Sequence, residues 1–162
     1  MEAEMSWARY DTDNGPGWIA WRDNGTIERM LLPGQPGPST EAGTVPTQVA
    51  RMAEDLTRYF AGSADLPAAG TFVDRASATD FEGSVYRIVT AIPSGTTMTY
   101  AEVAKRAGRS GAARAVGAAM AKNRFAPMIP CHRVVGSDGS LRGYAGGLDM
   151  KRRLLDMEAI RA

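Results

Sequence analysis

The sequence predicts a chain of two parts, an α/β first part and a mainly helical second part that contains a helix-turn-helix pattern. Short aromatic segments joined by turn residues open the chain, and apolar residues at helical spacing dominate after residue 80. Charge is divided as well. Residues 1–80 hold 6 Arg and no Lys against 12 acidic residues (net −6), whereas residues 81–162 hold 13 basic against 6 acidic residues (net +7). This split indicates that the second part meets a polyanion, although attraction between the two halves would also explain it.

Composition excludes several classes of protein. At 162 residues, 44% hydrophobic and 23% charged, the chain fits one average domain or two small ones that share a core. One Cys and one His can form neither an internal disulfide nor a Cys-rich zinc site, so we expect no metal and no cofactor. No apolar run approaches the ~20 residues that cross a bilayer. The acidic N-terminus lacks a signal-peptide pattern, so we expect a cytoplasmic protein (nucleoid-associated, or nuclear in a eukaryote) without a membrane partner.

The first part is predicted to begin with short strands and to end in a helix. Residues 6–32 read as strands, and Asn24-Gly25 is typical of a two-residue hairpin turn. A loop rich in Pro, Gly, Ser and Thr follows. Residues 47–62 then place Val49, Met52, Leu56, Tyr59 and Phe60 on one helical face that ends at Gly62. Residues 63–79 have no periodic pattern and are interpreted as a linker.

The second part is predicted to be mainly helical. Apolar residues recur at helical spacing from Phe81 to Ile92, with Asp80 or Thr79 as the N-cap. A second helix starts at Thr99, whose spacing to Glu102 fits a capping box, and ends at Gly108. The turn "GRSG" leads into a third helix, "AARAVGAAMAKN". Two short helices joined by a turn that contains Gly form a helix-turn-helix pattern.

This third helix consists almost entirely of Ala, Gly and Val, with Arg114 and Met120 as exceptions. Small residues let a helix pack tightly against a neighbour. They would also make a helix thin enough to enter a narrow DNA groove, with Arg114 as the one long side chain. Nearby basic residues could hold phosphates: Lys105, Arg106, Arg109, Lys122 and Arg124.

The single cysteine and the single histidine are adjacent, as Cys131 and His132, within "NRFAPMIPCHRVVGSDG". A thiolate is a good nucleophile only if a base, a cation or a helix N-terminus lowers its pKa. Neighbours on a strand point to opposite faces, so direct contact would need a bend or a bridging water. The histidine also needs a partner, and the last helix offers Asp149, Asp156 and Glu158. The pair would equally fit a buried structural cysteine beside a hydrogen-bonded histidine.

The motif "IPCHRVV", followed by "GYAGG" and a terminal helix with Glu158, resembles the active-site region of the O6-alkylguanine-DNA alkyltransferases (methylated-DNA–protein-cysteine methyltransferases). The likeness extends upstream through "IPSGTTMTYAEVAKRAG" and "AARAVGAAMAKNRF", and so covers most of residues 80–160. The first half matches only loosely, chiefly at "RYFAG".

The resemblance assigns roles to residues. Cys131 is the expected alkyl acceptor, and His132 the base that acts on it through a water. Glu158 is the carboxylate that orients the histidine, and Asn123 braces the turn after the recognition helix. Tyr144 assists at the reacting guanine and is the expected proton donor.

For DNA, the resemblance implies that Tyr100 helps to rotate the nucleotide and that Arg114 enters the base stack in its place. The small-residue helix would lie in the minor groove. The complete set of expected DNA-binding residues is Tyr100, Arg114, Ala115, Gly117, Met120, Lys122, Arg133 and Lys151.

The family fold would be an α/β domain with a ribonuclease H-like core over residues 1–75, then a winged-helix DNA-binding domain over residues 76–162 that carries the active site. The implied function is single-turnover repair of double-stranded DNA that contains O6-alkylguanine, with O4-alkylthymine as a second candidate substrate. We expect a monomer in solution, with cooperative binding on DNA left open. Arg142 and Gly143 differ from some relatives in the loop that borders the alkyl pocket, which leaves the preferred alkyl group open.

Three rival functions can be distinguished. A non-catalytic alkyltransferase-like protein would bind lesions without reacting, but in that group the cysteine is replaced, and Cys131 argues against it. A helix-turn-helix regulator would bind DNA unmodified and tolerate Cys131→Ser. A cysteine hydrolase fits poorly, because no oxyanion motif is recognisable in the sequence.

Overall fold

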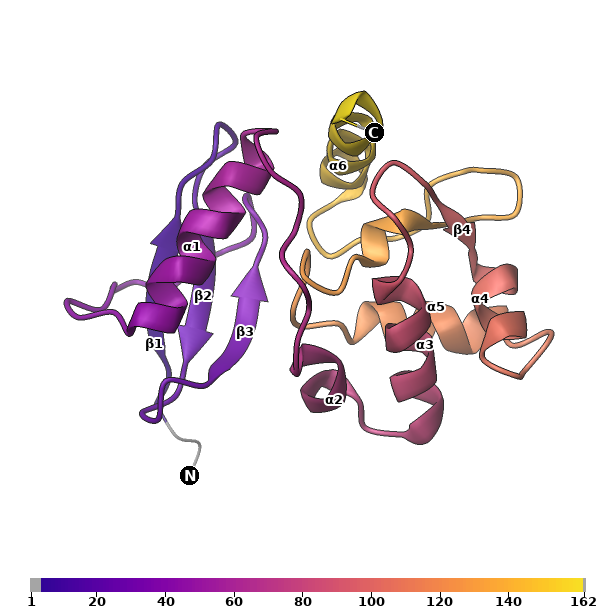
Figure 1. Ribbon diagram of the computed structural model, residues 1–162, viewed down its shortest axis with the longest axis horizontal. Helices are drawn as coiled ribbons and strands as arrows, with labels where there is room; N and C mark the ends of the chain where they lie inside the picture. The colour runs from indigo at the N-terminus through magenta and orange to yellow at the C-terminus, as the bar shows by residue number, and fades with distance from the viewer. Residues whose placement is uncertain (1–3, 162) are drawn as a thin grey trace. The chain divides into compact units, whose positions relative to one another are not determined.

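The structure is a computed structural model that describes residues 4–161. The chain divides into two compact units, Met1–Pro67 and Ala68–Ala162. Figure 1 shows a small sheet with one helix in the first unit and mainly helices in the second. Among residues 4–161, no helix combines the length and apolar character that crossing a bilayer requires.

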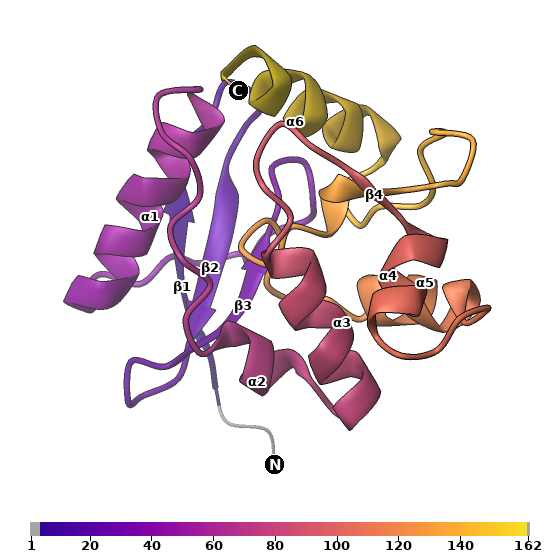
Figure 2. The ribbon, with the colours of Figure 1, turned by 45° about the vertical axis from the view of Figure 1, so that its right-hand side comes forward.

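The first unit is an antiparallel sheet covered by one helix. Its strands β1 (Ser6–Tyr10), β2 (Gly17–Trp21) and β3 (Ile27–Leu31) lie in sequence order. Helix α1 (Thr47–Phe60) lies against the sheet, as Figure 2 shows, and confirms the predicted helix. Tyr10 connects the two layers, since its ring stacks on Phe60 with centroids 5.7 Å apart and its hydroxyl donates to the Leu31 carbonyl at 2.7 Å.

The predicted two-residue hairpin turn between β2 and β3 is wrong in its position. The Gly25 amide donates to the Arg22 carbonyl at 2.7 Å, so Asp23 and Asn24 are the central residues of the turn. Gly25 follows them with φ +80°, a conformation that glycine adopts without strain. The Asn24 side chain accepts from the Thr26 amide at 3.0 Å and holds the turn from within. The connection is therefore one residue longer than Asn24-Gly25 alone would predict.

The second unit contains helices α2 (Phe72–Ala76), α3 (Asp80–Thr90), α4 (Tyr100–Arg106), α5 (Ala113–Ala121) and α6 (Leu148–Arg161). Helix α2 lies within the predicted linker, which is a correction to that prediction. Its Phe72 ring stacks on Phe125 with centroids 4.9 Å apart, and Arg124 donates to the Arg75 carbonyl at 2.7 Å. Tertiary contacts thus support a helix of five residues, too short for a periodic pattern in the sequence.

The starts of α3 and α4 follow the local sequence. Thr79 caps α3 by accepting the Glu82 amide at 3.1 Å, which decides between the two predicted caps. Thr99 caps α4 by accepting the Glu102 amide at 3.1 Å, as the capping-box spacing predicts. Gly108 ends the second predicted helix with φ +84°.

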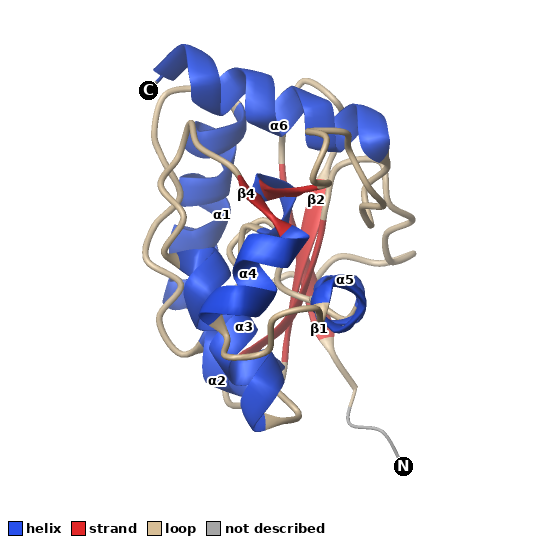
Figure 3. Cartoon of the chain, turned by 90° about the vertical axis from the view of Figure 1, so that its right-hand side faces the viewer, coloured by secondary structure: helices blue, strands red, loops and turns tan. Residues whose placement is uncertain are grey.

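A short parallel strand pair places the start of α4 beside the cysteine segment. Strand β4 (Met98–Thr99) pairs with β5 (Val134–Val135), with Thr99 opposite Val135. Figure 3 shows this pair above α4. Tyr100 follows β4 directly, and a 3₁₀ turn, Cys131–Arg133, precedes β5. The pairing therefore connects two segments of the chain that are more than 30 residues apart.

Helices α3 and α5 are joined by a buried hydrogen bond, for which we predict a measurable contribution to stability. The Tyr86 hydroxyl donates to the Ala119 carbonyl at 2.7 Å, and burial raises the pKa of Tyr86 to about 12. We expect Tyr86→Phe to lower the free energy of unfolding by about 1 kcal/mol, because the buried carbonyl loses a donor. Urea denaturation of both proteins measures the difference. An unchanged midpoint with an unchanged slope would show that the bond contributes nothing.

Candidate active site

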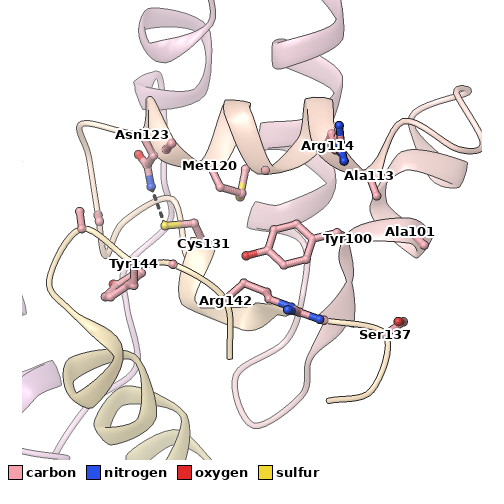
Figure 4. A pocket seen from close by; sticks show the side chains of 16 residues that line it. Tyr100, Ala101, Ala113, Arg114, Met120, Asn123, Cys131, Ser137, Arg142 and Tyr144 are labelled. Carbon is pink, nitrogen blue, oxygen red and sulfur yellow. Dashed lines mark hydrogen bonds between the residues drawn. The ribbon is translucent and has the colours of Figure 1, made fainter. Parts of the chain in front are cut away.

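A pocket of about 600 Å³ lies between α4, α5 and the loop that follows β5. This volume is within the range of small-molecule sites, and a purine base fits such a space. Figure 4 shows Cys131 and Asn123 at one end of the pocket, with Tyr100 and Arg142 farther along it. The lining residues are Tyr100, Ala101, Ala113, Arg114, Gly117, Met120, Ala121, Asn123, Ala126, Cys131, Gly136, Ser137, Arg142, Gly143, Tyr144 and Ala145.

Cys131 presents its sulfur to this pocket from a 3₁₀ turn rather than from the extended segment considered above. Three residues make one turn of such a helix, so the side chains of Cys131 and His132 point about 120° apart. The Asn123 amide donates to Sγ at 3.3 Å. Burial raises the pKa of the Cys131 thiol, while the Asn123 hydrogen bond and the charge of Lys151 oppose that rise. The site therefore favours a thiol that ionises only when a base takes its proton.

Asn123 also holds the backbone around the cysteine. Its amide nitrogen donates to the Ile129 carbonyl at 2.8 Å, and its oxygen accepts from the Phe125 amide at 2.9 Å. One side chain thus connects the end of α5, the following turn and the sulfur of Cys131. This arrangement is what the bracing role expected for Asn123 requires.

Behind the cysteine, His132, Arg133 and Glu158 form a buried charged cluster. His132 Nε2 lies 2.9 Å from Glu158 Oε2. Arg133 binds the same carboxylate with two nitrogens, Nε at 2.9 Å and an NH2 group at 2.7 Å, and donates to the Ile92 carbonyl at 2.7 Å. Burial lowers the pKa of His132, although Glu158 opposes that shift. The net shift favours the neutral imidazole, the form that can accept a proton.

This cluster selects one carboxylate among those that the sequence offered. Glu158 contacts His132, as expected, whereas Asp149 and Asp156 lie elsewhere on α6. Arg133 was expected to contact DNA, and the structure contradicts this prediction, because its guanidinium is buried against Glu158. A charged side chain that is buried and paired in this way supports the site from within.

The two tyrosines and the lysine with expected roles lie around the same pocket. Tyr100 and Tyr144 both line it, and the Tyr144 ring meets His132 edge-on with centroids 6.3 Å apart. Lys151 is buried. Its Nζ lies 5.8 Å from the centre of the Tyr100 ring and donates a hydrogen bond to the Arg142 carbonyl at 3.2 Å. Burial also lowers the pKa of Lys151. Lys151 is therefore placed to support the pocket, not to reach DNA from the surface.

The expected DNA-binding residues of α5 fall into two groups. Arg114 and Ala115 are exposed and Gly117 is half-buried, so their helix face can be approached from outside. Met120 is buried and lines the pocket instead. Lys122, at the end of α5, donates to Glu82 Oε2 at 2.9 Å and thereby ties α5 to α3. This contact, with the backbone amide of Ala78, holds the pKa of Glu82 below its usual range.

The sequence alone did not assign the part of the pocket wall formed by Ala126 and Gly136, whereas Ser137 lies in the loop expected to border the pocket. The sequence signal that could have located Gly136 in the wall is the glycine itself. A Cβ at this position would lie 2.7 Å from Arg142 Nε, which is too close for any other residue without a shift of the arginine. The adjacent loop carries a turn motif, "SDGS", in which Asp138 accepts from the Ser140 amide at 3.0 Å.

Comparisons with known proteins agree with this architecture. Residues 80–160 match the family model of the 6-O-methylguanine DNA methyltransferase DNA-binding domain. The chain is 36% identical over 142 residues to a methylated-DNA–protein-cysteine methyltransferase of Methanothermobacter thermautotrophicus, covering 88% of this chain and 78% of the relative. It is 40% identical over 127 residues to that of Mycobacterium tuberculosis, covering 78% and 70%.

Solved structures show the same fold. The crystal structure of Mycobacterium tuberculosis O6-methylguanine methyltransferase matches with a TM-score of 0.76 and 32% identity, over 98% of this chain and 95% of that one. The Mycobacterium tuberculosis OGT in complex with DNA matches with a TM-score of 0.76 and 33% identity, over 97% and 94%. These matches confirm the resemblance stated from the motifs, and the chain belongs to the methylated-DNA–protein-cysteine methyltransferase family.

Proposed function

We propose that the chain repairs DNA directly, by moving the alkyl group from O6 of an alkylated guanine to the sulfur of Cys131. The observation that carries the proposal is a buried thiol with an amide donor, which lines a pocket large enough for a purine base and is followed by a histidine paired to a carboxylate. The Mycobacterium tuberculosis relative, which has been crystallised in complex with DNA, supports DNA as the partner.

In this proposal, the His132–Glu158 pair supplies the base. A carboxylate accepts hydrogen bonds, so the neutral ring keeps its proton on Nε2 and the lone pair on Nδ1. The thiol proton of Cys131 passes through a water to Nδ1, as the family resemblance implies. The Asn123 amide, 3.3 Å from Sγ, stabilises the thiolate that forms.

The thiolate then attacks the alkyl carbon, the carbon–oxygen bond breaks, and its electron pair goes to guanine O6. A proton from Tyr144 neutralises the departing guanine, and the tyrosine regains a proton from the histidinium through solvent. The products are an S-alkylcysteine and unmodified guanine. Nothing in this sequence of steps cleaves the thioether, so each molecule reacts once.

The base must leave the duplex to reach Cys131, which costs a few kcal/mol. Arg114, exposed on α5 and lining the pocket, is the proposed occupant of the vacated space. The small side chains of Ala115 and Gly117 let the helix approach the minor groove. Tyr100, directly after β4, is proposed to help rotate the nucleotide.

The first unit is proposed to have a ribonuclease H-like core and the second to be a winged-helix domain in which β4 and β5 accompany α4 and α5. The proposed domains comprise residues 1–75 and residues 76–162. We also propose a cytoplasmic location, a monomeric state in solution and O4-alkylthymine as a second substrate.

Mass spectrometry tests the proposed transfer. After incubation with duplex DNA that carries one O6-methylguanine, we expect one added methyl group on the peptide that contains Cys131 and no second event per molecule. Cys131→Ser should bind the same duplex without a change in mass. Tight binding by the wild-type chain without methylation would instead indicate a non-catalytic lesion binder.

A further inference from the structure

Arg142 lines the pocket, yet neither the chemistry proposed above nor the small-residue helix uses it. Three contacts place the residue. Its carbonyl accepts from the buried Lys151 Nζ at 3.2 Å, its Nε passes over Gly136, where a Cβ would lie 2.7 Å away, and its guanidinium is 3.8 Å from Asp138 Oδ1. The side chain is therefore directed along the pocket by its surroundings.

The guanidinium keeps its capacity to bind an anion. Its contact with Asp138 is long, and the two side chains are 58% and 67% exposed, so solvent screens the ion pair and little energy is lost by exchanging it. Arg114 lines the same pocket from α5. Two guanidinium groups from different elements thus flank the space that a nucleotide would occupy.

The direction of the side chain distinguishes between two kinds of anion. In Figure 4, Arg142 runs past Tyr100 toward Ser137, away from the sulfur of Cys131. The alkyl group must lie at the sulfur, so this guanidinium does not face it. The anion that accompanies every nucleotide is its phosphate, which lies at the end opposite the reacting O6. Guanidinium groups bind phosphate with two parallel hydrogen bonds.

We propose that Arg142 binds a phosphate of the extruded nucleotide and holds it in the pocket while Cys131 reacts. This inference rests on the proposed function, since it concerns the same pocket and the same substrate. The Arg142 contact with a phosphate, made from the loop after β5, would be additional to the DNA contacts expected from α5. The consequence is that Arg142 contributes to reaction with DNA and makes no contribution to reaction with an isolated nucleobase, which has no phosphate.

The test compares two substrates, duplex DNA with one O6-methylguanine and the nucleobase O6-methylguanine at millimolar concentration. Methylation of Cys131 is followed by mass spectrometry for wild type, Arg142→Ala and Arg142→Lys. Arg51→Ala, which removes an equal charge from an exposed position of α1, is the matched control. With duplex below saturation, we expect Arg142→Ala to be about tenfold slower and Arg142→Lys to recover part of the rate. With the nucleobase, all four proteins should react alike.

Salt dependence gives a second readout that a purely structural role would not change. The slope of log rate on duplex against log salt concentration should become less steep by about 0.9 in Arg142→Ala, the value for one phosphate contact. The slope for Arg51→Ala should equal that of the wild-type chain.

Three outcomes would overturn the phosphate-binding role of Arg142, and a fourth would overturn the proposed function. Equal loss on both substrates would show that Arg142 shapes the pocket, and no loss on either would show that it has no role. If Arg142→Ala loses rate only on a third substrate, a duplex with O6-carboxymethylguanine, the guanidinium binds an anionic alkyl group instead of a phosphate. If the wild-type chain methylates Cys131 with neither substrate, the proposed function itself fails.

Discussion

Replacing Glu158 with Gln is expected to slow alkyl transfer to Cys131 by about 10²- to 10⁴-fold, the range that loss of an oriented general base produces. The carboxylate lies 2.9 Å from His132 Nε2 and keeps the ring proton there. An amide can turn its NH2 group toward Nε2, which would force the proton onto Nδ1 and remove the base. Single-turnover methylation of Cys131, followed by mass, measures the rate.

The same substitution is expected to destabilise the fold. Arg133 donates two hydrogen bonds to Glu158 and is itself buried, so its charge would remain without a counterion. Breaking such a pair costs about 3–5 kcal/mol. Rates must therefore be measured where denaturation curves show the variant to be folded. Transfer at the wild-type rate by folded Glu158→Gln would contradict the assigned role.

His132→Gln is the matched control for Glu158→Gln. It removes the base and leaves the Arg133–Glu158 pair in place, so we expect a comparable loss of rate with a smaller loss of stability.

The dependence of the wild-type transfer rate on pH tests the role of His132 separately. Because burial lowers its pKa, transfer should persist below pH ~6.5, the ordinary pKa of histidine, before protonation of the ring stops it.

Replacing Asn123 with Asp is expected to slow transfer at pH 7 by about 10- to 1000-fold. The substitution puts a carboxylate where an amide now donates to Sγ at 3.3 Å. Burial already raises the pKa of the Cys131 thiol, and a negative charge at this distance would raise it further. The rate should then increase with pH, by up to tenfold per pH unit until the thiol ionises.

Asn123→Ala separates the charge from the loss of the hydrogen bonds. It deprives the Ile129 carbonyl and the Phe125 amide of their partners, so we expect lower stability with a weaker effect on the rate. The rate of Cys131 alkylation by iodoacetamide as a function of pH reports the thiol pKa in each protein. If Asn123→Asp and Asn123→Ala show the wild-type pKa, the amide does not stabilise the thiolate.

Local signals in the sequence were sufficient for most helices. The starts of α3 and α4 depend on Thr79 and Thr99, which bond to amides three residues away, and such contacts can be read from spacing alone. The turn after β2 was misplaced by one residue, because Asn24-Gly25 is compatible with more than one turn geometry. Helix α2 was missed, because its stability comes from the stacking of Phe72 on a ring 53 residues later in the chain.

The sequence by itself determined the family, and it predicted the reacting residues, because Cys131, His132 and their flanking motifs are contiguous and chemically distinctive. It did not determine that Arg133 is buried on Glu158, that Asn123 reaches Sγ, or that Arg142 crosses Gly136 into the pocket. These contacts join segments that come together only when α5, the cysteine turn and α6 pack. Hydrogen bonds and burial act over a few ångströms in space, and separation along the chain carries no information about that distance until the chain is folded.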